Sequence, residues 1–300
     1  MEKKKVILDT DIGSDIDDAF CLAYLLGNPN CELLGITTVS GEAEKRAMMA
    51  SALCYASGKD IPIYPGIEEP LFSEQKQPIA QQAKKLSNWK HKKEFEKGYA
   101  IEFLRKTIRE HPHEISLLAI GPLTNIALLF MIDPEIPTLL KEIILMAGYF
   151  KNKTTYGYEW NVMCDPYAAT KVFETGVKVH KSVGLDVTLK VTMNSKEVRK
   201  IIEDLNSELL MPVIDFADVW FENNDIVTFH DPLAAVALFN NEVCKFVKGN
   251  VNVHLDNEKF GATSWTYNEN ATNQIALEVD SSMFFDKYFE VFRKTKEAVI

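Results

Sequence analysis

The hydrophobic residues of this chain form short apolar runs that alternate with stretches of helical length. In the first half, the runs that predict buried strands are residues 6–8, 32–39, 61–64, 115–120 and 143–146. The stretches that predict helices are residues 19–26, 42–57, 100–110 and 126–131. Strands that alternate with helices predict right-handed βαβ units, and therefore an α/β fold with a largely parallel Rossmann-like sheet flanked by helices.

The second half continues this pattern with fewer strands. Predicted helices cover residues 166–174, 195–224, 233–239 and 281–294, and predicted strands cover 179–187, 246–253 and 275–279. The sequence contains no internal repeat, low-complexity tract or Gly/Ser linker. We therefore expect residues 1–300 to form a single domain.

Residues 67–98 interrupt the pattern, because they are polar, rich in Gln and Lys, and show little periodicity. A stretch of this length inside a compact domain is typical of a functional loop, and we expect a variable loop region near the pocket. Trp89 within it either covers the pocket or anchors the segment to the core.

Charge and composition exclude several classes of partner. The net charge is -10, which argues against nucleic acid, and no apolar run approaches the roughly 18 residues of a membrane span. The five cysteines are odd in number and show no C-x-x-C spacing, which favours a reduced cytoplasmic protein. Five histidines lie in polar surroundings and are predicted at the surface: His91, His111, His113, His180 and His254.

The densest group of candidate functional residues lies between the first strand and the first helix. This stretch holds five aspartates: Asp9, Asp11, Asp15, Asp17 and Asp18. Ser14 is a plausible N-cap, and one or two acids in a first helical turn are ordinary capping residues. Five like charges beside a core strand exceed that need, and carboxylate oxygens are the ligands of a hard metal cation.

Two later motifs are predicted to meet this stretch. Glu159-Trp160-Asn161 and His230-Asp231-Pro232 each lie where an apolar element meets a helix. In a parallel sheet the carboxyl ends of the strands share one edge, where ligands bind. Asp165-Pro166 is better explained as an ordinary helix start, with Asp as cap and Pro in the first turn.

A pocket assembled in this way would have two kinds of group. Asp11, Asp18 and Asp231 would supply three carboxylates to a cation. The remaining polar side chains could bind the hydroxyl groups of a sugar: Asp17, Glu159, Asn161 and His230.

These motifs together resemble a known family. Asp9-Thr10-Asp11-Ile12-Gly13, followed by Asp17-Asp18-Ala19, is similar to the signature of the inosine-uridine-preferring nucleoside hydrolases. Further segments match in the right order: residues 36–39, 121–127, 145–148, 159–161 and 230–232. The resemblance implies the nucleoside hydrolase fold and Ca²⁺-dependent hydrolysis of the N-glycosidic bond of ribonucleosides, giving ribose and free base. It also implies a homodimer or homotetramer.

The resemblance further implies a role for each matching residue. Asp11, Asp18, Asp231 and the backbone carbonyl of Ile120 would bind Ca²⁺. Asp11 would also act as general base on the water that attacks an oxocarbenium-like ribosyl group. Asp17, Glu159, Asn161 and Met146 would contact the ribose. His230 would lie near the base and assist the leaving group.

Some positions depart from the family pattern. Asp15 is an additional acid, and Glu42 replaces an Asn that contacts the substrate, so we expect Glu42 near the sugar. Lys153 stands roughly where an Asn contacts the 5′ end of the sugar. Residues 67–98 lack the His-containing loop around the base, so the nucleobase preference stays open.

Two other functions compete with this interpretation. A haloacid-dehalogenase-like Mg²⁺ phosphatase also starts with an apolar strand that runs into D-x-D, here Asp9-Thr10-Asp11, and needs a later lysine such as Lys141 or Lys181. A non-catalytic protein that binds nucleoside or ribose would keep the metal pocket, and Glu42 and Lys153 favour it.

Overall fold

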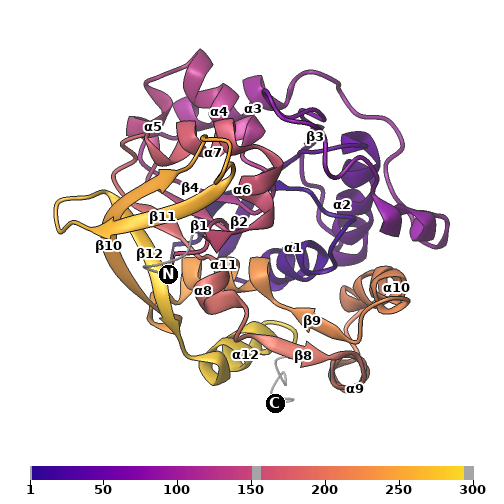
Figure 1. The fold of residues 1–300 in the computed structure, drawn as a ribbon. Helices are drawn as coiled ribbons and strands as arrows, with labels where there is room; N and C mark the ends of the chain where they lie inside the picture. The colour runs from indigo at the N-terminus through magenta and orange to yellow at the C-terminus, as the bar shows by residue number, and fades with distance from the viewer. Residues whose placement is uncertain (1, 151–156, 294–300) are drawn as a thin grey trace.

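A ten-stranded sheet forms the centre of the structure (Figure 1), which is a computed structural model describing residues 2–150 and 157–293. The strand order is β3-β2-β1-β4-β5-β7-β12-β10-β11-β6. Strands from β3 to β12 are parallel to their neighbours, and the remaining three extend the sheet antiparallel. The strands are β1 (Lys4–Thr10), β2 (Cys31–Thr38), β3 (Ile63–Pro65), β4 (Ile115–Ala119), β5 (Glu142–Leu145), β6 (Gly157–Tyr158), β7 (His180–Ser182), β10 (Cys244–Val253), β11 (Ala262–Tyr267) and β12 (Asn273–Val279).

Helices follow most of the parallel strands. The longer ones are α1 (Asp17–Gly27), α2 (Ala43–Ser57), α3 (Ala100–Glu110), α4 (Thr124–Ile132), α7 (Pro166–Phe173), α9 (Ser195–Leu205), α10 (Leu210–Phe221), α11 (His230–Phe239) and α12 (Ser281–Glu290). Short helical segments are η1 (Gln81–Asn88), α5 (Ile136–Leu139), α6 (Trp160–Cys164), α8 (Leu185–Thr188) and η2 (Asn241–Val243). A separate antiparallel pair, β8 (Thr192–Asn194) and β9 (Ile226–Thr228), lies beside α9.

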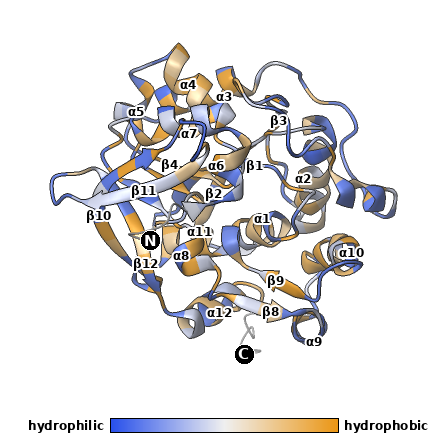
Figure 2. Ribbon diagram, in the orientation of Figure 1, coloured by the Kyte–Doolittle hydropathy of each residue, from blue (hydrophilic) through white to orange (hydrophobic). Residues whose placement is uncertain are grey.

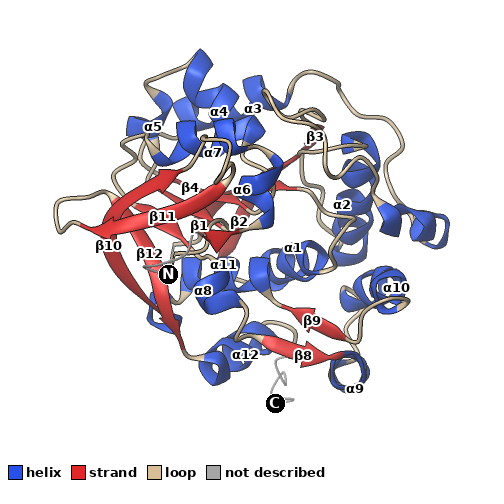
Figure 3. Ribbon diagram, viewed as in Figure 1, coloured by secondary structure: helices blue, strands red, loops and turns tan. Residues whose placement is uncertain are grey.

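The central strands β1, β4 and β5 are largely buried on both faces of the sheet. Successive side chains of β1 point to opposite sides and enter two cores. Val6 and Leu8 pack in a core with the apolar residues of α1, α2, α10 and α11, whereas Ile7 packs in a second core with α3, α4 and α7. Figure 3 shows helices packed around the central strands, while β10 and β11 lie at the left edge of the view. The predicted α/β fold is therefore confirmed.

The sequence pattern fails where a helix interrupts an apolar run. Residues 179–187 were predicted as a strand, but β7 ends at Ser182 and Leu185 begins the short helix α8. Val183 and Val187 are both fully buried, so hydrophobicity alone does not distinguish the two conformations.

The predicted helix over residues 195–224 is two helices. Asn206 ends α9 in the left-handed conformation, with φ 46°, and α10 begins at Leu210. Asn is one of the few residues that accept this conformation readily, which explains the break.

Several short elements went unpredicted, among them β6, β8, β9, β11 and α5. Strand β11 carries the polar sequence ATSWTY and is formed through its pairing with β10. Tertiary context, not local pattern, determines such a strand.

The predicted surface position of His180 is wrong. His180 is fully buried in β7, between β5 and β12, and its ring stacks on Phe173 with centroids 5.5 Å apart. The polar residues beside it in the sequence, such as Lys181, do not report this burial because side chains alternate along a strand.

The polar segment between β3 and α3 is mostly irregular and contains η1. Figure 2 shows η1, at the right-hand edge, mostly in the blue of hydrophilic residues, beside the apolar α10. Trp89 anchors it, because its indole Nε1 donates to Oδ2 of Asp215 on α10 at 2.8 Å. Trp89 does not line the cavity described below.

None of the helices in the described ranges is long and apolar enough to cross a bilayer.

Candidate active site

A cavity of about 530 Å³ lies at the carboxyl ends of the central parallel strands. Asp11, Ile120 and Met146 follow β1, β4 and β5 almost directly, and these strands are neighbours in the sheet. Nine of the ten residues to which the sequence assigned a site role line the cavity: Asp11, Asp17, Asp18, Ile120, Met146, Glu159, Asn161, His230 and Asp231.

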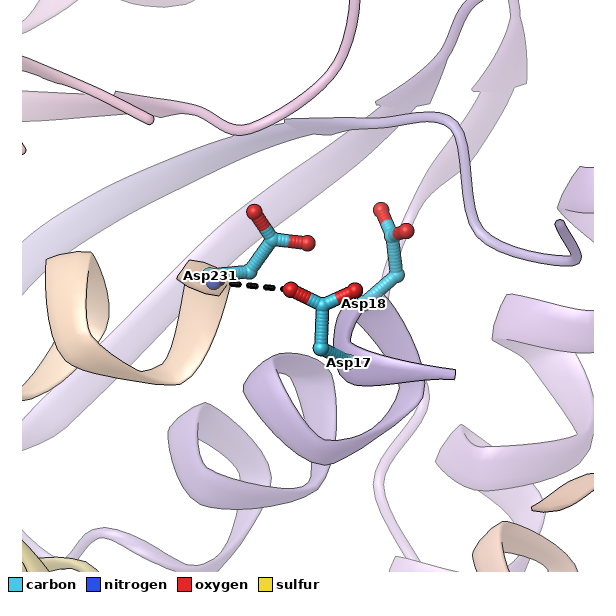
Figure 4. A group of neighbouring side chains, drawn as sticks. All are labelled: Asp17, Asp18 and Asp231. Carbon is cyan, nitrogen blue, oxygen red and sulfur yellow. Dashed lines mark hydrogen bonds between the residues drawn. The ribbon is translucent and has the colours of Figure 1, made fainter. Parts of the chain in front are cut away.

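The tightest group of acids comes from the first turns of α1 and α11. Carboxylate oxygens of Asp17, Asp18 and Asp231 lie within 4.8 Å of one another, and the three residues are buried. Figure 4 shows the three carboxyl groups together and the hydrogen bond of 3.0 Å from the Asp231 backbone N–H to Oδ2 of Asp17. Such a set of buried oxygen ligands can hold a metal ion.

The electrostatics of this group are unfavourable for bare carboxylates. Burial raises the pKa of Asp18 and of Asp231 well above its usual range, and repulsion from neighbouring aspartates adds to the shift. The Thr10 hydroxyl opposes it by donating to Oδ1 of Asp18 at 2.5 Å. A bound cation would remove the repulsion.

The loop that precedes α1 differs from the predicted capping arrangement. Ser14 is not the N-cap, because Ile16 occupies that position and provides no side-chain cap. Gly13 has a φ of 122°, a conformation that favours glycine, and a Cβ there would lie 2.9 Å from the sulfur of Met49. Asp15, the additional acid, lines the cavity and accepts from the Ile16 backbone N–H at 2.6 Å. Its pKa is raised to about 6, mainly by burial.

Asp11 lies in the same cavity but outside the closest group of three acids. Its Oδ2 accepts a hydrogen bond from the Gln77 amide. Its Oδ1 faces Gly121, where a Cβ would lie only 2.7 Å from that oxygen, so glycine permits the close approach.

Arg46 supports this loop from behind and was not identified from the sequence. It is fully buried on α2. Its guanidinium donates to the backbone carbonyls of Asp11 and Gly41 and, at 3.2 Å, to that of Ile12. Its charge also opposes the rise in the pKa of Asp11 that burial causes. Arg46 directly follows Glu44 and the exposed Lys45, so nothing in the local sequence distinguishes it from a surface residue.

Glu159 and Asn161 lie at the start of α6. Glu159 is the N-cap: its carboxylate accepts from the backbone N–H groups of Asn161 at 2.7 Å and of Gly148 and Val162 at 3.1 Å. Burial raises the pKa of Glu159 to about 7. The Asn161 amide donates to the carbonyls of Ile120, at 2.8 Å, and Met146, at 3.0 Å.

His230 lines the cavity from the start of α11. Its Nδ1 lies 2.8 Å from the Thr188 hydroxyl. Burial lowers the pKa of His230 to about 4, so the ring is neutral at pH 7.

Three other predicted positions lie elsewhere. Glu42 is not among the cavity residues; its carboxylate accepts from the Ala80 backbone N–H at 3.0 Å and pairs with Lys45. Asp165 caps α7, as predicted, by accepting from Ala168 N–H. Lys153 lies outside the described residues. Sequence reasoning missed Gln77, Gln81 and Trp220 as parts of the cavity wall.

Known proteins are similar to this chain over most of its length. The family model of the inosine-uridine preferring nucleoside hydrolases matches residues 6–286. Uridine nucleosidase 1 of Arabidopsis thaliana is 30% identical over 269 residues, covering 83% of this chain and 78% of the relative. The pyrimidine-specific ribonucleoside hydrolase RihB of Escherichia coli O157:H7 is 27% identical and covers 98% of both chains.

Solved structures show the same likeness. A purine-preferring ribonucleoside hydrolase from Gardnerella vaginalis superposes with a TM-score of 0.81 at 25% identity, covering 96% of this chain and 98% of the other. A plant nucleoside hydrolase gives a TM-score of 0.83 at 25% identity, covering 97% and 99%. The chain therefore belongs to the inosine-uridine preferring nucleoside hydrolase family and is an enzyme of the N-glycosyl hydrolase class.

Proposed function

We propose that this chain hydrolyses the N-glycosidic bond of ribonucleosides with the help of Ca²⁺, giving ribose and free base. The observation that carries the proposal is that Asp11, Asp17, Asp18 and Asp231 meet Glu159 and Asn161 in one cavity, in a chain of this family. The similar proteins include pyrimidine-specific and purine-preferring enzymes, so the base preference is left open.

The residues present fit a hard divalent cation. The closest group is three buried carboxylates, and oxygen donors in number are what Ca²⁺ binds. We propose that Asp18 and Asp231 hold it, with Asp11 and the Ile120 carbonyl, and that Asp17 is close enough to share in binding it. When bound, the cation supplies positive charge that acidifies a water molecule and attracts sugar hydroxyls.

The residues of the chain itself supply the remaining chemistry. Asp11 accepts the proton of the attacking water as general base. The surrounding carboxylates stabilise the positive charge that develops on the ribosyl group as the bond to the base breaks. Glu159 is held rigidly by three backbone N–H groups, which suits it to orient ribose hydroxyls together with Asn161 and Asp17.

The proposed role of His230 is at the leaving group. With the Thr188 hydroxyl donating to Nδ1, Nε2 carries the proton of the neutral ring and can donate a hydrogen bond to the departing base. We assign no sugar contact to Glu42, since its carboxylate is engaged by Ala80 and Lys45.

A base-release screen tests the proposal. Purine, pyrimidine and nicotinamide ribosides are incubated with the protein and Ca²⁺, and free base is measured by chromatography. We expect release from at least one class, its loss with EDTA, and a fall in kcat of at least a thousand-fold in Asp11→Ala. Asp204→Ala, on the exposed side of α9, is the matched control. No release from any riboside in the presence of Ca²⁺ would contradict the proposal.

The structure bears on one of the competing interpretations, the phosphatase. Neither Lys141 nor Lys181 lines the cavity, and Lys181 binds Asn241, so the structure does not favour a phosphatase. The homo-oligomer and the cytoplasmic location remain predictions.

A further inference from the structure

Gln77 connects two sides of the cavity. It lies in the polar segment between β3 and η1 and is only 7% exposed. Its Nε2 donates to Oδ2 of Asp11, and its Oε1 accepts from the Trp160 indole N–H at 2.7 Å. One side chain therefore links the residue that follows β1 to the first residue of α6.

The amide satisfies both partners, because it both donates and accepts. A carboxylate accepts hydrogen bonds and cannot donate, whereas an indole N–H only donates. A glutamate at this position would place a second anion against Asp11, and an asparagine is one methylene shorter. The two contacts also assign the orientation of the Gln77 amide, with nitrogen toward Asp11.

The guanidinium of Arg46 holds the backbone of Gln77 as well as that of Asp11. The buried Arg46 donates to the carbonyls of Gln77 and Ile79, both at 3.4 Å, and to the carbonyl of Asp11. The Ser40 hydroxyl also donates to the Gln77 carbonyl, at 3.3 Å. The separation between Gln77 and Asp11 is therefore fixed from behind by α2.

We propose that Gln77 is a positioning residue that sets the plane of the Asp11 carboxylate and holds Trp160 at the cavity rim. The inference rests on the proposed function, in which Asp11 takes a proton from water. Oδ2 is held by Gln77 and Oδ1 is confined by Gly121, so the carboxylate has little freedom to rotate. Proton transfer depends steeply on such alignment, and a misplacement of about 1 Å can cost on the order of a hundred-fold in rate.

The kinetic test separates positioning from a simple wall contact. Gln77→Met keeps the side-chain length and removes the amide, and we expect kcat to fall ten-fold or more with KM changed less than three-fold. Gln81→Met makes the same substitution in the same cavity wall, at a residue that is not a hydrogen-bond partner of Asp11 in the described part of the chain. The fall in kcat should be at least five-fold larger for Gln77→Met than for Gln81→Met.

Trp160→Phe removes the indole donor while keeping an aromatic ring. Because it acts through the same amide, combining it with Gln77→Met should lower kcat no further than Gln77→Met alone. Additive losses would contradict the shared role.

A second measurement needs neither substrate nor metal. The chain has four tryptophans, so its indole N–H signals in an NMR spectrum are few, and Trp160→Phe identifies that of Trp160. In Gln77→Met this signal should move and its N–H should exchange faster with water. If the variant does not fold, Gln77→Asn provides the same comparison with a shorter amide.

The outcomes discriminate between the two proposals. A wild-type protein that releases no base would contradict the proposed function. Active wild-type protein, with kcat of Gln77→Met within two-fold of it or with only KM raised, would overturn the role of Gln77 alone. An unchanged Trp160 signal would also overturn it.

Discussion

His180 shows what complete burial does to one titratable side chain. The ring lies inside the sheet and against Phe173. Burial lowers its pKa to about 3, although the backbone carbonyl of Thr175 opposes the shift. The folded protein therefore holds this histidine neutral through the whole range in which an exposed histidine becomes charged.

This pKa predicts a loss of stability in acid. Below about pH 6.5 the unfolded chain binds a proton at His180, whereas the folded chain binds it only near pH 3. The free energy of unfolding therefore decreases as the pH falls between these values. Between pH 7 and pH 5 the contribution is about 2 kcal/mol. Urea unfolding should show that His180→Leu loses about that much less stability than wild type over this interval. Equal losses in the two proteins would contradict the prediction.

The candidate site could be predicted from the sequence where its residues follow an apolar run or begin a helix. The acids between β1 and α1, and those at the starts of α6 and α11, have this local signature. Gln77 and Arg46 have none, because they contact Asp11 from 66 and 35 residues away in the sequence. Glu42 also begins a predicted helix and so has this local signature. Its carboxylate, however, binds the Ala80 backbone N–H and Lys45, contacts that form only in the folded chain.

At the scale of elements, the pattern predicts long apolar strands and helices and misses short ones. Strand β4 is buried along its whole length and was predicted from its apolar run. Helix α8 and strand β11 depend on neighbours that no local window contains. The helical periodicity of residues 195–224 is real, but it contains no signal strong enough to locate the turn at Asn206.

The contact between η1 and α10 is an example with a measurable consequence. Asp215 on α10 accepts hydrogen bonds from Lys85, Asn88 and Trp89, each at 2.8 Å. Because three donors lose their acceptor together, Asp215→Ala should lower the free energy of unfolding by roughly 1–3 kcal/mol and detach η1 locally.

Limited proteolysis with trypsin measures this detachment. Cleavage after the lysines of η1 should be several-fold faster in Asp215→Ala than in wild type. Glu222→Ala is the matched control, because Glu222 forms a solvent-exposed ion pair with Lys84. Exposed ion pairs contribute only about 0–1 kcal/mol to the free energy of unfolding. The idea fails if both variants are cut at the wild-type rate.

At the scale of the whole molecule, the acid cluster links stability to the proposed cation. Repulsion among Asp17, Asp18 and Asp231 opposes folding, and a cation that binds only the folded state offsets it. With Ca²⁺ at about 100 times its Kd, the gain is about 2.7 kcal/mol, which should raise Tm by roughly 5 °C.

Differential scanning calorimetry of Asp231→Asn checks this linkage. Without Ca²⁺ the variant should be at least as stable as wild type, because one like charge is gone, while its Tm should respond little to added Ca²⁺. Asp204→Asn, on exposed α9, should keep the full response. An undiminished Ca²⁺ response in Asp231→Asn would place the ion elsewhere.

Asp17 and Asp231, which meet in this cluster, are 214 residues apart in the sequence. The aspartates of α1 leave the ribosome long before Asp231, which leaves only after most of the sheet has been translated. A nascent chain, or a proteolytic fragment that lacks either part, therefore has only some of the proposed ligands and should bind the ion more weakly than the full chain. The proposed cation site is therefore complete only late in synthesis, when α11 docks on α1.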